Sequence, residues 1–227
     1  HRFSRREAEV MAALQALNAS LEGRVRDRTD TLERLLKEVT HRVKNSLQLT
    51  SSMLRLQQRH AADPTVATQL AEAQARVLTI ARLHEHLYQA GNFEQVELRR
   101  YLGTICTDLA AALPGHGCAF ACTLHRSLVR VDLAVPLALI VTELVTNAMK
   151  HAFVGPLGTV AVTLEDAGDG RGRLVVADDG VGLPPDFSPE RAAGLGMQII
   201  RGLVGQVHGT LRAQGGSGGT RFEVVFP

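Results

Sequence analysis

A single spacing of residues constrains the fold of this chain more than any other feature. From Leu14 to His60 a 3-4 repeat runs without a break over more than six heptads, and nine of its fourteen positions are apolar. Such a period predicts one long helix that belongs to a coiled coil or a helical bundle. The charged segment 21–29 is typical of a connector between parallel helices, although a solvated helix without a signalling role has the same pattern. The repeat consists of Leu14, Asn18, Leu21, Val25, Arg28, Leu32, Leu35, Val39, Arg42, Ser46, Leu49, Met53, Leu56 and His60.

Asp63 and Pro64 predict a turn into a second helix. Asp63 is a good N-terminal cap, and proline is well tolerated at the first helical position. Gly91 and Asn92 predict the end of this helix. Each of the two antiparallel helices would have an apolar face that a lone hairpin cannot bury. We therefore expect a second copy to complete a four-helix bundle, the alternative being a monomer that covers the face with the rest of the chain. The second helix repeats the spacing at Val66, Leu70, Ala73, Val77, Ile80, His84 and Leu87.

After Gly91 the pattern changes to shorter helical and β-rich stretches. The glycine-rich run 168–172 predicts a hairpin turn. Helices followed by mostly antiparallel strands predict an α+β fold: a long helical hairpin, then a two-layer α/β sandwich. We expect helices over 98–113, from a cap at Asp132 to about His151 and over 195–207, and strands over 118–124, 128–131, 158–166, 173–178, 210–213 and 220–226.

Composition excludes some classes of function. A net charge of +2 gives no support for a nucleic-acid partner. Cys106, Cys118 and Cys122 lack the spacing of metal ligands, and their odd number fits a reducing compartment. Cys118 and Cys122 fall on one face of an expected strand and are interpreted as small core residues.

The chain has no signal peptide and begins within helical sequence. Its longest apolar stretch, 133–145, contains Pro136 and Glu143 and is too short to span a bilayer. We expect a cytoplasmic fragment of a longer protein whose upstream sensor part is absent here and whose full length could be membrane-tethered.

Four polar residues fall on one side of the helix expected to end near His151. Glu143 and Asn147 are four residues apart and share a face. A carboxylate and an amide carbonyl are oxygen ligands suited to Mg²⁺. Lys150 and His151 add donors for phosphate nearby. A helix with a solvated polar stripe would look the same when taken alone.

Three glycine-containing motifs follow in a fixed order. Asp178 ends a strand and precedes Gly180 and Gly182, which allow close approach of the backbone to a flat ligand. The Asp178 carboxylate could accept a hydrogen bond from an exocyclic amine. The run 194–196, Gly-Leu-Gly, opens a helix whose free N–H groups suit phosphate. Each motif alone is weak evidence, but their combination with Thr220 on the last strand predicts a nucleotide pocket.

Together with the stretch His41-Arg42-Val43-Lys44-Asn45, these motifs resemble those of the sensor histidine kinases. The segment from about Phe93 to Pro227 resembles the ATP-binding domain, or Bergerat fold, that these kinases share with gyrase B and MutL. The stretch at His41 resembles the H-R-x-K-N phosphoacceptor box of a subgroup related to the HWE kinases. A chain without tryptophan lacks the Trp-x-Glu motif of the HWE group itself. The resemblance covers about Leu32 to the end.

The resemblance implies a role for each motif residue. Asn147 would coordinate Mg²⁺, with Glu143 ordering metal-bound water, and Lys150 and His151 would face the phosphates. Asp178 would accept from the adenine amino group. The remaining positions would shape the adenine pocket, anchor the lid or close the back wall: Gly180, Gly182, Gly194, Leu195, Gly196 and Thr220.

His41 would receive the γ-phosphoryl group. It falls outside the apolar repeat, so we expect an exposed imidazole. Arg42 follows it, where commoner kinases have an acid that acts as base. We hypothesise that Glu38 or Asn45, on the same helical face, orients the ring. His84 and His86 are rival acceptors.

The sequence thus predicts a histidine kinase core that uses Mg·ATP to phosphorylate His41 and passes the group to the aspartate of a response regulator. We expect a coiled-coil signalling helix over 1–31, a dimerisation and phosphoacceptor hairpin over 32–91 and a catalytic domain over 92–227, with a hinge at 88–93. A phosphotransferase or docking module that has lost nucleotide binding is the main alternative, and an ATPase or anti-sigma type kinase of the same fold is another.

Overall fold

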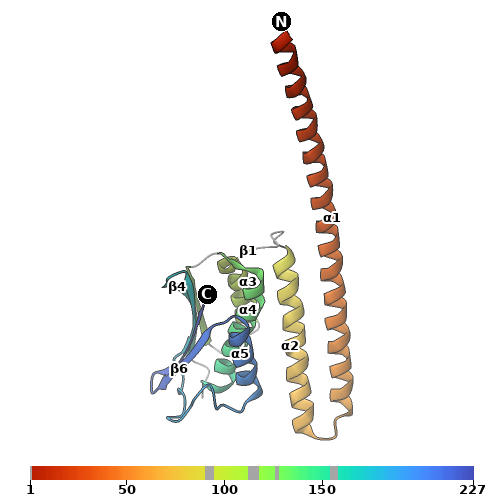
Figure 1. Ribbon diagram of the computed structural model, residues 1–227. Helices are drawn as coiled ribbons and strands as arrows, with labels where there is room; N and C mark the ends of the chain where they lie inside the picture. The colour runs from red at the N-terminus through yellow and green to blue at the C-terminus, as the bar shows by residue number, and fades with distance from the viewer. Residues whose placement is uncertain (1, 90–94, 112–117, 126–127, 154–157) are drawn as a thin grey trace.

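The computed structural model describes residues 2–89, 95–111, 118–125, 128–153 and 158–227. Its N-terminal part is a helical hairpin of α1 (Arg2–His60) and α2 (Pro64–Gln89). The Asp63 carboxylate accepts a hydrogen bond from the backbone N–H of Thr65 at 2.7 Å, which confirms the predicted cap. The helices lie antiparallel, and α1 extends far beyond α2 toward the N-terminus (Figure 1).

Two sides of α1 differ in exposure. The side toward α2 carries the partly buried residues Leu36, Val43, Leu47 and Leu54 and the buried Ser51. The apolar members of the 3-4 repeat lie on a different side of the helix. The repeat therefore leaves an uncovered apolar stripe along α1. The stripe consists of residues that are 44% to 63% exposed: Leu14, Leu21, Val25, Leu32, Leu35, Val39, Leu49, Met53 and Leu56.

The rest of the chain forms an α/β domain beside α2 (Figure 1). Five strands form one sheet in the order β2-β4-β5-β7-β6, and β1 pairs with β3. β2 and β4 are parallel and all other neighbours are antiparallel. The predicted α+β order is confirmed. The elements are β1 (Gln95–Glu97), α3 (Leu98–Ala111), β2 (Cys118–Leu124), β3 (Leu128–Arg130), α4 (Val131–His151), β4 (Gly158–Gly168), β5 (Arg171–Asp178), α5 (Leu195–Gln206), β6 (Thr210–Gly216) and β7 (Gly219–Phe226).

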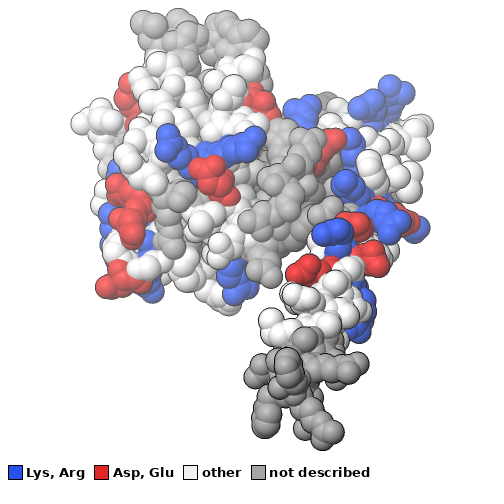
Figure 2. Space-filling view, turned by 90° about the horizontal axis from the view of Figure 1, so that it is seen from above, with Lys and Arg blue, Asp and Glu red and all other residues white. Residues whose placement is uncertain are grey.

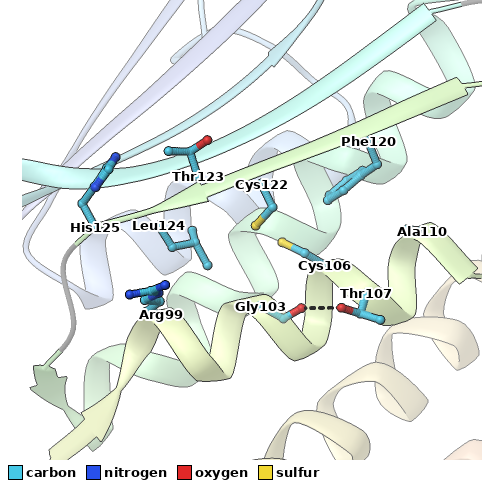
Figure 3. A pocket seen from close by; sticks show the side chains of 10 residues that line it. All are labelled: Arg99, Gly103, Cys106, Thr107, Ala110, Phe120, Cys122, Thr123, Leu124 and His125. Carbon is cyan, nitrogen blue, oxygen red and sulfur yellow. Dashed lines mark hydrogen bonds between the residues drawn. The ribbon is translucent and has the colours of Figure 1, made fainter.

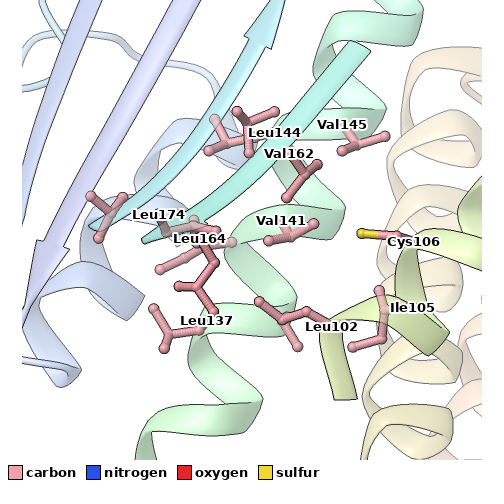
Figure 4. Packing of buried hydrophobic residues seen from close by; sticks show 14 of the residues in the cluster. Leu102, Ile105, Cys106, Leu137, Val141, Leu144, Val145, Val162, Leu164 and Leu174 are labelled. Carbon is pink, nitrogen blue, oxygen red and sulfur yellow. The ribbon is translucent and has the colours of Figure 1, made fainter. Parts of the chain in front are cut away.

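The main core lies between the sheet and the helices that cover it. Leu102 of α3 and Leu137 and Val141 of α4 point toward Val162 and Leu164 of β4 (Figure 4). All five side chains are buried. Because the core is built almost entirely from aliphatic side chains, it agrees with the low aromatic content of 4%.

The hairpin and the α/β domain share part of this core. Leu83 and Leu87 of α2 are 3% exposed and belong to the same buried cluster as Leu98 and Tyr101 of α3. The Tyr101 hydroxyl donates a hydrogen bond to the backbone oxygen of Leu83 at 3.0 Å. Burial raises the pKa of this hydroxyl. The domain is therefore docked on α2.

The predicted cap of α4 was wrong, and most of the predicted hinge lies outside the described residues. Arg130, not Asp132, occupies the N-cap position of α4, and it makes no side-chain cap hydrogen bond. Asp132 lies in the first turn, where its carboxylate pairs with the Arg130 guanidinium. Most of the predicted hinge, 90–93, lies outside the described residues.

α4 is long and apolar enough, by length and composition, to cross a membrane. It is longer than the stretch 133–145 because the helix continues through the polar residues up to His151. Within the described part of the chain it is the one such helix, and 56% of its apolar window is buried inside the protein. Its position under the sheet accounts for its hydropathy.

Charges of both signs are intermixed on the face seen in Figure 2, over the α/β domain as well as over the hairpin. This mixture fits the net charge of +2 and offers no single-sign surface for a polyanion on that face.

Candidate functional site

Glu143, Asn147 and Gly196 converge where α4 meets the start of α5. Glu143 is buried and Asn147 is half-buried. A Cβ placed on Gly196 would lie 3.3 Å from Glu143 Oε2 and 3.6 Å from both side-chain heavy atoms of the Asn147 amide. The structure therefore brings the two candidate metal residues together with the second glycine of the Gly-Leu-Gly motif, as the sequence predicted. Two hard oxygen donors side by side suit Mg²⁺.

The guanidinium of Arg76, on α2, forms an ion pair with the Glu143 carboxylate in this structure. Arg76 Nε lies 2.7 Å from Glu143 Oε1, and Arg76 Nη2 lies 3.2 Å from Oε2. The side chains are only 20% and 10% exposed. This bidentate contact joins the hairpin to the candidate metal site, and nothing in the local sequence around Arg76 marks it.

A second ion pair joins the same two helices. Lys150 Nζ lies 2.7 Å from Glu72 Oε1. The hydrogen bond from Lys150 lowers the pKa of the Glu72 carboxyl. Lys150 therefore faces an acid of α2 in the docked arrangement, while His151 is exposed.

Asp178 is fixed at the end of β5 by backbone donors. Its Oδ1 accepts hydrogen bonds from the N–H of Gly180 at 3.0 Å and of Thr220 at 3.2 Å. Thr220 is buried on β7, opposite Asp178. Gly182 has a φ of +78° and lies against Gly216, where a Cβ would come within 2.1 Å of the Gly216 oxygen. The two backbone hydrogen bonds hold the Asp178 carboxylate in place. Position 182 requires glycine because of its positive φ and its close approach to Gly216.

The segment 194–196 forms the beginning of α5. Gly194 is the N-cap, and no side chain caps the free N–H groups there. Leu195 is exposed. Arg201 of α5 donates from Nη1 to the backbone oxygens of Pro189 and Ala192, at 2.5 and 2.9 Å, and so fastens the preceding loop. A helix end with free N–H groups beside Glu143 and Asn147 can bind an anion.

His41 lies on α1 and is exposed, as predicted. Its neighbour Glu38 accepts hydrogen bonds from Arg42, from Nε at 3.0 Å and Nη2 at 2.6 Å, so Arg42 holds this carboxylate. Asn45 is also exposed and, within the described part of the chain, makes no hydrogen bond to His41. Neither hypothesised partner orients the imidazole in this arrangement.

His41 and the candidate nucleotide site lie at different levels of the hairpin. Lys44, three residues after His41, pairs with Glu85 of α2 at 2.7 Å. Arg76, which holds Glu143, precedes Glu85 by nine residues of helix, which corresponds to about 14 Å along the axis. The site and the acceptor are therefore well separated along the hairpin.

A cleft of about 680 Å³ lies between α3 and β2, outside the site predicted from the sequence (Figure 3). Its lining includes Arg99, Phe120, Leu124 and His125. Across it the sulfur atoms of Cys106 and Cys122 point toward one another (Figure 3). Among the described residues no group of three or more His, Cys, Asp or Glu side chains that could hold a metal ion occurs here or elsewhere.

Cys122 is exposed and Cys106 is buried, and both are free thiols. The interpretation of Cys122 as a core residue was wrong, because β2 is an edge strand of the sheet and leaves this position open. Burial, followed by the contact with Cys122, raises the pKa of the Cys106 thiol.

The helical hairpin joined to this α/β sandwich defines a two-domain class of ATP-dependent signalling kinase. A histidine kinase family model matches residues 38–113, and the model of the histidine kinase-, DNA gyrase B- and HSP90-like ATPases matches residues 132–227. The histidine kinase domain of a blue-light activated kinase from Erythrobacter litoralis has a TM-score of 0.62 and 29% identity, covering 88% of this chain and 94% of that one. The chain belongs to the sensor histidine kinases, as its motifs indicated.

Curated relatives agree with this assignment. The sensor histidine kinase PdtaS of Mycobacterium tuberculosis is 35% identical over 173 residues, which are 74% of this chain and 34% of PdtaS. The blue-light-activated histidine kinase 2 of Erythrobacter litoralis is 32% identical over 208 residues, 88% of this chain and 59% of the relative. The chain thus spans between about a third and three fifths of the length of these relatives.

Proposed function

We propose that this chain is a kinase core that phosphorylates His41 with Mg·ATP and passes the phosphoryl group to an aspartate of a response regulator. The convergence of Glu143, Asn147 and Gly196 carries this proposal, because it places two oxygen donors beside an uncapped helix end. An oxygen-lined metal position next to an anion-binding helix end is what a metal-bound triphosphate needs. The matched ATPase family supports the use of ATP.

The residues of the pocket have distinct roles in this proposal. Asn147 holds Mg²⁺ and Glu143 orders water on the metal. Lys150 and His151 bind the phosphates once α2 has moved away. When bound, Mg²⁺ supplies positive charge that offsets the phosphate oxygens.

The adenine base occupies the other end of the pocket, and the lid begins beside the metal residues. Asp178 accepts from the adenine amino group through its second oxygen, since its first oxygen is held by backbone donors. Gly180 and Gly182 let the backbone approach the adenine, and Thr220 closes the back wall. Gly194, Leu195 and Gly196 anchor the lid at the start of α5.

His41 is the acceptor in this proposal because it is exposed within the phosphoacceptor box. Its rival His84 is half-buried, and burial lowers the pKa of its imidazole. The side chain of His86 lies outside the description. One imidazole nitrogen of His41 attacks the γ-phosphorus in line, and the bond to the bridging oxygen of ADP breaks. The ring proton passes to solvent or to the Glu38 carboxylate after that side chain reorients, while Asn45 can orient the ring by a hydrogen bond. Positioning and charge neutralisation account for most of the rate.

The α/β domain must move for this reaction. The candidate site is docked against Arg76, about 14 Å along α2 from the level at which Lys44 pairs with Glu85, and His41 lies nearly one helical turn beyond Lys44. A swing about 88–93 would carry the nucleotide to His41 and then clear the histidine for the regulator.

We further infer that 1–31 is a signalling helix, 32–91 the dimerisation and phosphoacceptor hairpin, and 92–227 the catalytic domain. The exposed apolar stripe of α1 supports a homodimer through a four-helix bundle. The partner for phosphotransfer is a response-regulator receiver domain, the input comes from an upstream sensor segment, and the fragment works in the cytoplasm.

The test is incubation with radiolabelled Mg·ATP. We expect acid-labile, alkali-stable label on the parent chain, lost in His41→Gln and in Asn147→Ala. His60→Gln, an exposed histidine on the same helix, is the matched control and should keep the label. Label that survives in His41→Gln would move the acceptor to His84 or His86, and a parent that binds no ATP would favour a phosphotransferase.

A further inference from the structure

The face of α2 that meets α4 carries two opposite charges one helical turn apart. Glu72 and Arg76 face Lys150 and Glu143, respectively, across the interface. In both pairs the residue on α4 belongs to the candidate nucleotide site, and the residue on α2 has the sign of the group that site would bind. We propose, on the basis of the proposed function, that α2 fills the candidate nucleotide site in place of Mg·ATP when the α/β domain is docked on the hairpin. Arg76 takes the place of the metal at Glu143, and Glu72 takes the place of a phosphate oxygen at Lys150.

The Arg76 guanidinium engages both oxygens of the carboxylate that would face the metal. Both carboxylate oxygens of Glu143 accept hydrogen bonds from Arg76, at 2.7 and 3.2 Å. A Cβ added at Gly196 would lie 3.3 Å from Oε2, so the glycine leaves that side of the carboxylate open toward the start of α5. A divalent cation or its water would need the same oxygens and would meet the charge of the guanidinium. Arg76 and Mg²⁺ therefore compete for Glu143.

At Lys150 a carboxylate of α2 takes the place that a phosphate oxygen of the nucleotide would have. The Glu72 carboxylate lies 2.7 Å from Lys150 Nζ, and that hydrogen bond lowers the pKa of Glu72, so the group is ionised at neutral pH. A phosphate that approaches Lys150 has to displace this carboxylate. Nucleotide binding and docking on α2 thus exclude each other at two points, and by linkage each weakens the other equally.

The docked arrangement is also poised for release. Arg76 Nη1 is buried and has no hydrogen-bond partner among the described residues, which costs free energy in the docked state. The apolar half of the interface, with Tyr101 bonded to Leu83, uses neither ion pair. Charge can therefore be removed from the docking face without disturbing the apolar contact.

The experiment measures affinity for a non-hydrolysable ATP analogue by calorimetry, with and without Mg²⁺, on the whole chain. We expect Arg76→Ala and Glu72→Gln each to tighten binding about tenfold with Mg²⁺, within the usual range of coupling between sites. Without Mg²⁺ the gain in Arg76→Ala should shrink below about twofold, since its competitor is absent, whereas the gain in Glu72→Gln should persist. This difference separates substitution for metal and phosphate from a general loosening of the interface.

Matched controls lie on the same helix. Arg82→Ala removes an exposed cation of α2, and Glu85→Gln removes an acid that pairs with Lys44 inside the hairpin. Neither should change the affinity. Arg76→Gln, with circular dichroism on every variant, guards against misfolding in Arg76→Ala. Unchanged or weaker Mg·nucleotide binding in the folded Arg76 and Glu72 variants would overturn this inference alone. A parent chain that binds no nucleotide in either condition would instead overturn the proposed function.

Discussion

Gly180 lies directly against the backbone carbonyl oxygen of Ala152, at the end of α4. A Cβ at position 180 would come within 2.2 Å of that oxygen, and the N–H of Val181 donates to the same oxygen at 2.9 Å. The loop that follows β5 is therefore fastened to α4, which joins the adenine end of the candidate pocket to the helix that carries its metal residues.

This contact predicts an unequal effect of two identical substitutions. Gly180→Ala should lower the free energy of unfolding by about 2 kcal/mol or more, because the methyl group meets backbone that cannot give way. Gly202→Ala, inside α5 with nothing within 4 Å of its Cβ direction, should raise it by about 0.5 to 1 kcal/mol. Urea unfolding measures both changes. Equal effects at the two glycines would contradict the close packing at 180.

The neighbouring acids Asp178 and Asp179 should differ in their effect on nucleotide affinity. In Asp178→Asn the side chain would present an amide donor to the adenine amino group, and we expect binding to weaken about 10- to 100-fold. Asp179 is exposed, and its Oδ1 accepts from the N–H of Thr159 at 2.6 Å, which lowers the pKa of its carboxyl. Asp179→Asn should leave the affinity within about twofold. Titration of both variants with ATP would sink the adenine assignment if Asp179→Asn had the larger effect.

Local patterns were enough to predict the elements and much of the site. The i, i+4 spacing of Glu143 and Asn147 places them on one helical face in any helix, and the glycines of 194–196 mark a helix start. The Asp63 cap is a hydrogen bond between residues only two positions apart, Asp63 and Thr65. Such features need no knowledge of tertiary contacts.

Features set by tertiary packing were missed or predicted wrongly. Arg76 is one of several charged residues on α2, and only docking against α4 selects it as the partner of Glu143. Cys122 was assigned to the core from strand alternation, but the edge position of β2 leaves it exposed. Glu38 has two cationic or polar neighbours within reach, and Arg42 holds it instead of His41.

The exposed stripe of α1 predicts that a charge placed near its C-terminal end breaks the homodimer. Leu49 and Met53 are 59% and 56% exposed in the single chain. Burying them against a second copy would contribute about 1.5 to 3 kcal/mol per side chain. We expect Met53→Glu to shift the mass measured by light scattering from two chains to one. Gln48→Glu, an exposed position outside the stripe, should leave two chains. A parent that already has the mass of one chain would contradict the bundle.

The thiols of Cys106 and Cys122 predict a loss of stability in alkali. Burial raises the pKa of Cys106 above its ordinary 9.0, so the folded state keeps this proton when the unfolded chain has lost it. The unfolded state then binds fewer protons, and the free energy of unfolding falls as pH rises above about 9, by at most about 1.4 kcal/mol per pH unit for one group. Tyr101, whose pKa burial raises above 10.0, adds a second loss of stability that begins about one pH unit higher.

Urea unfolding of the parent and of Cys106→Ala at pH 7.5, 9 and 10 measures how steeply the free energy of unfolding falls with pH. Cys106→Ala should reduce it between pH 9 and 10, whereas Cys122→Ala, at the exposed thiol, should retain most of it. A parent whose stability is unchanged up to pH 10 would show that the Cys106 thiol is not protonated more strongly in the fold than in the unfolded chain.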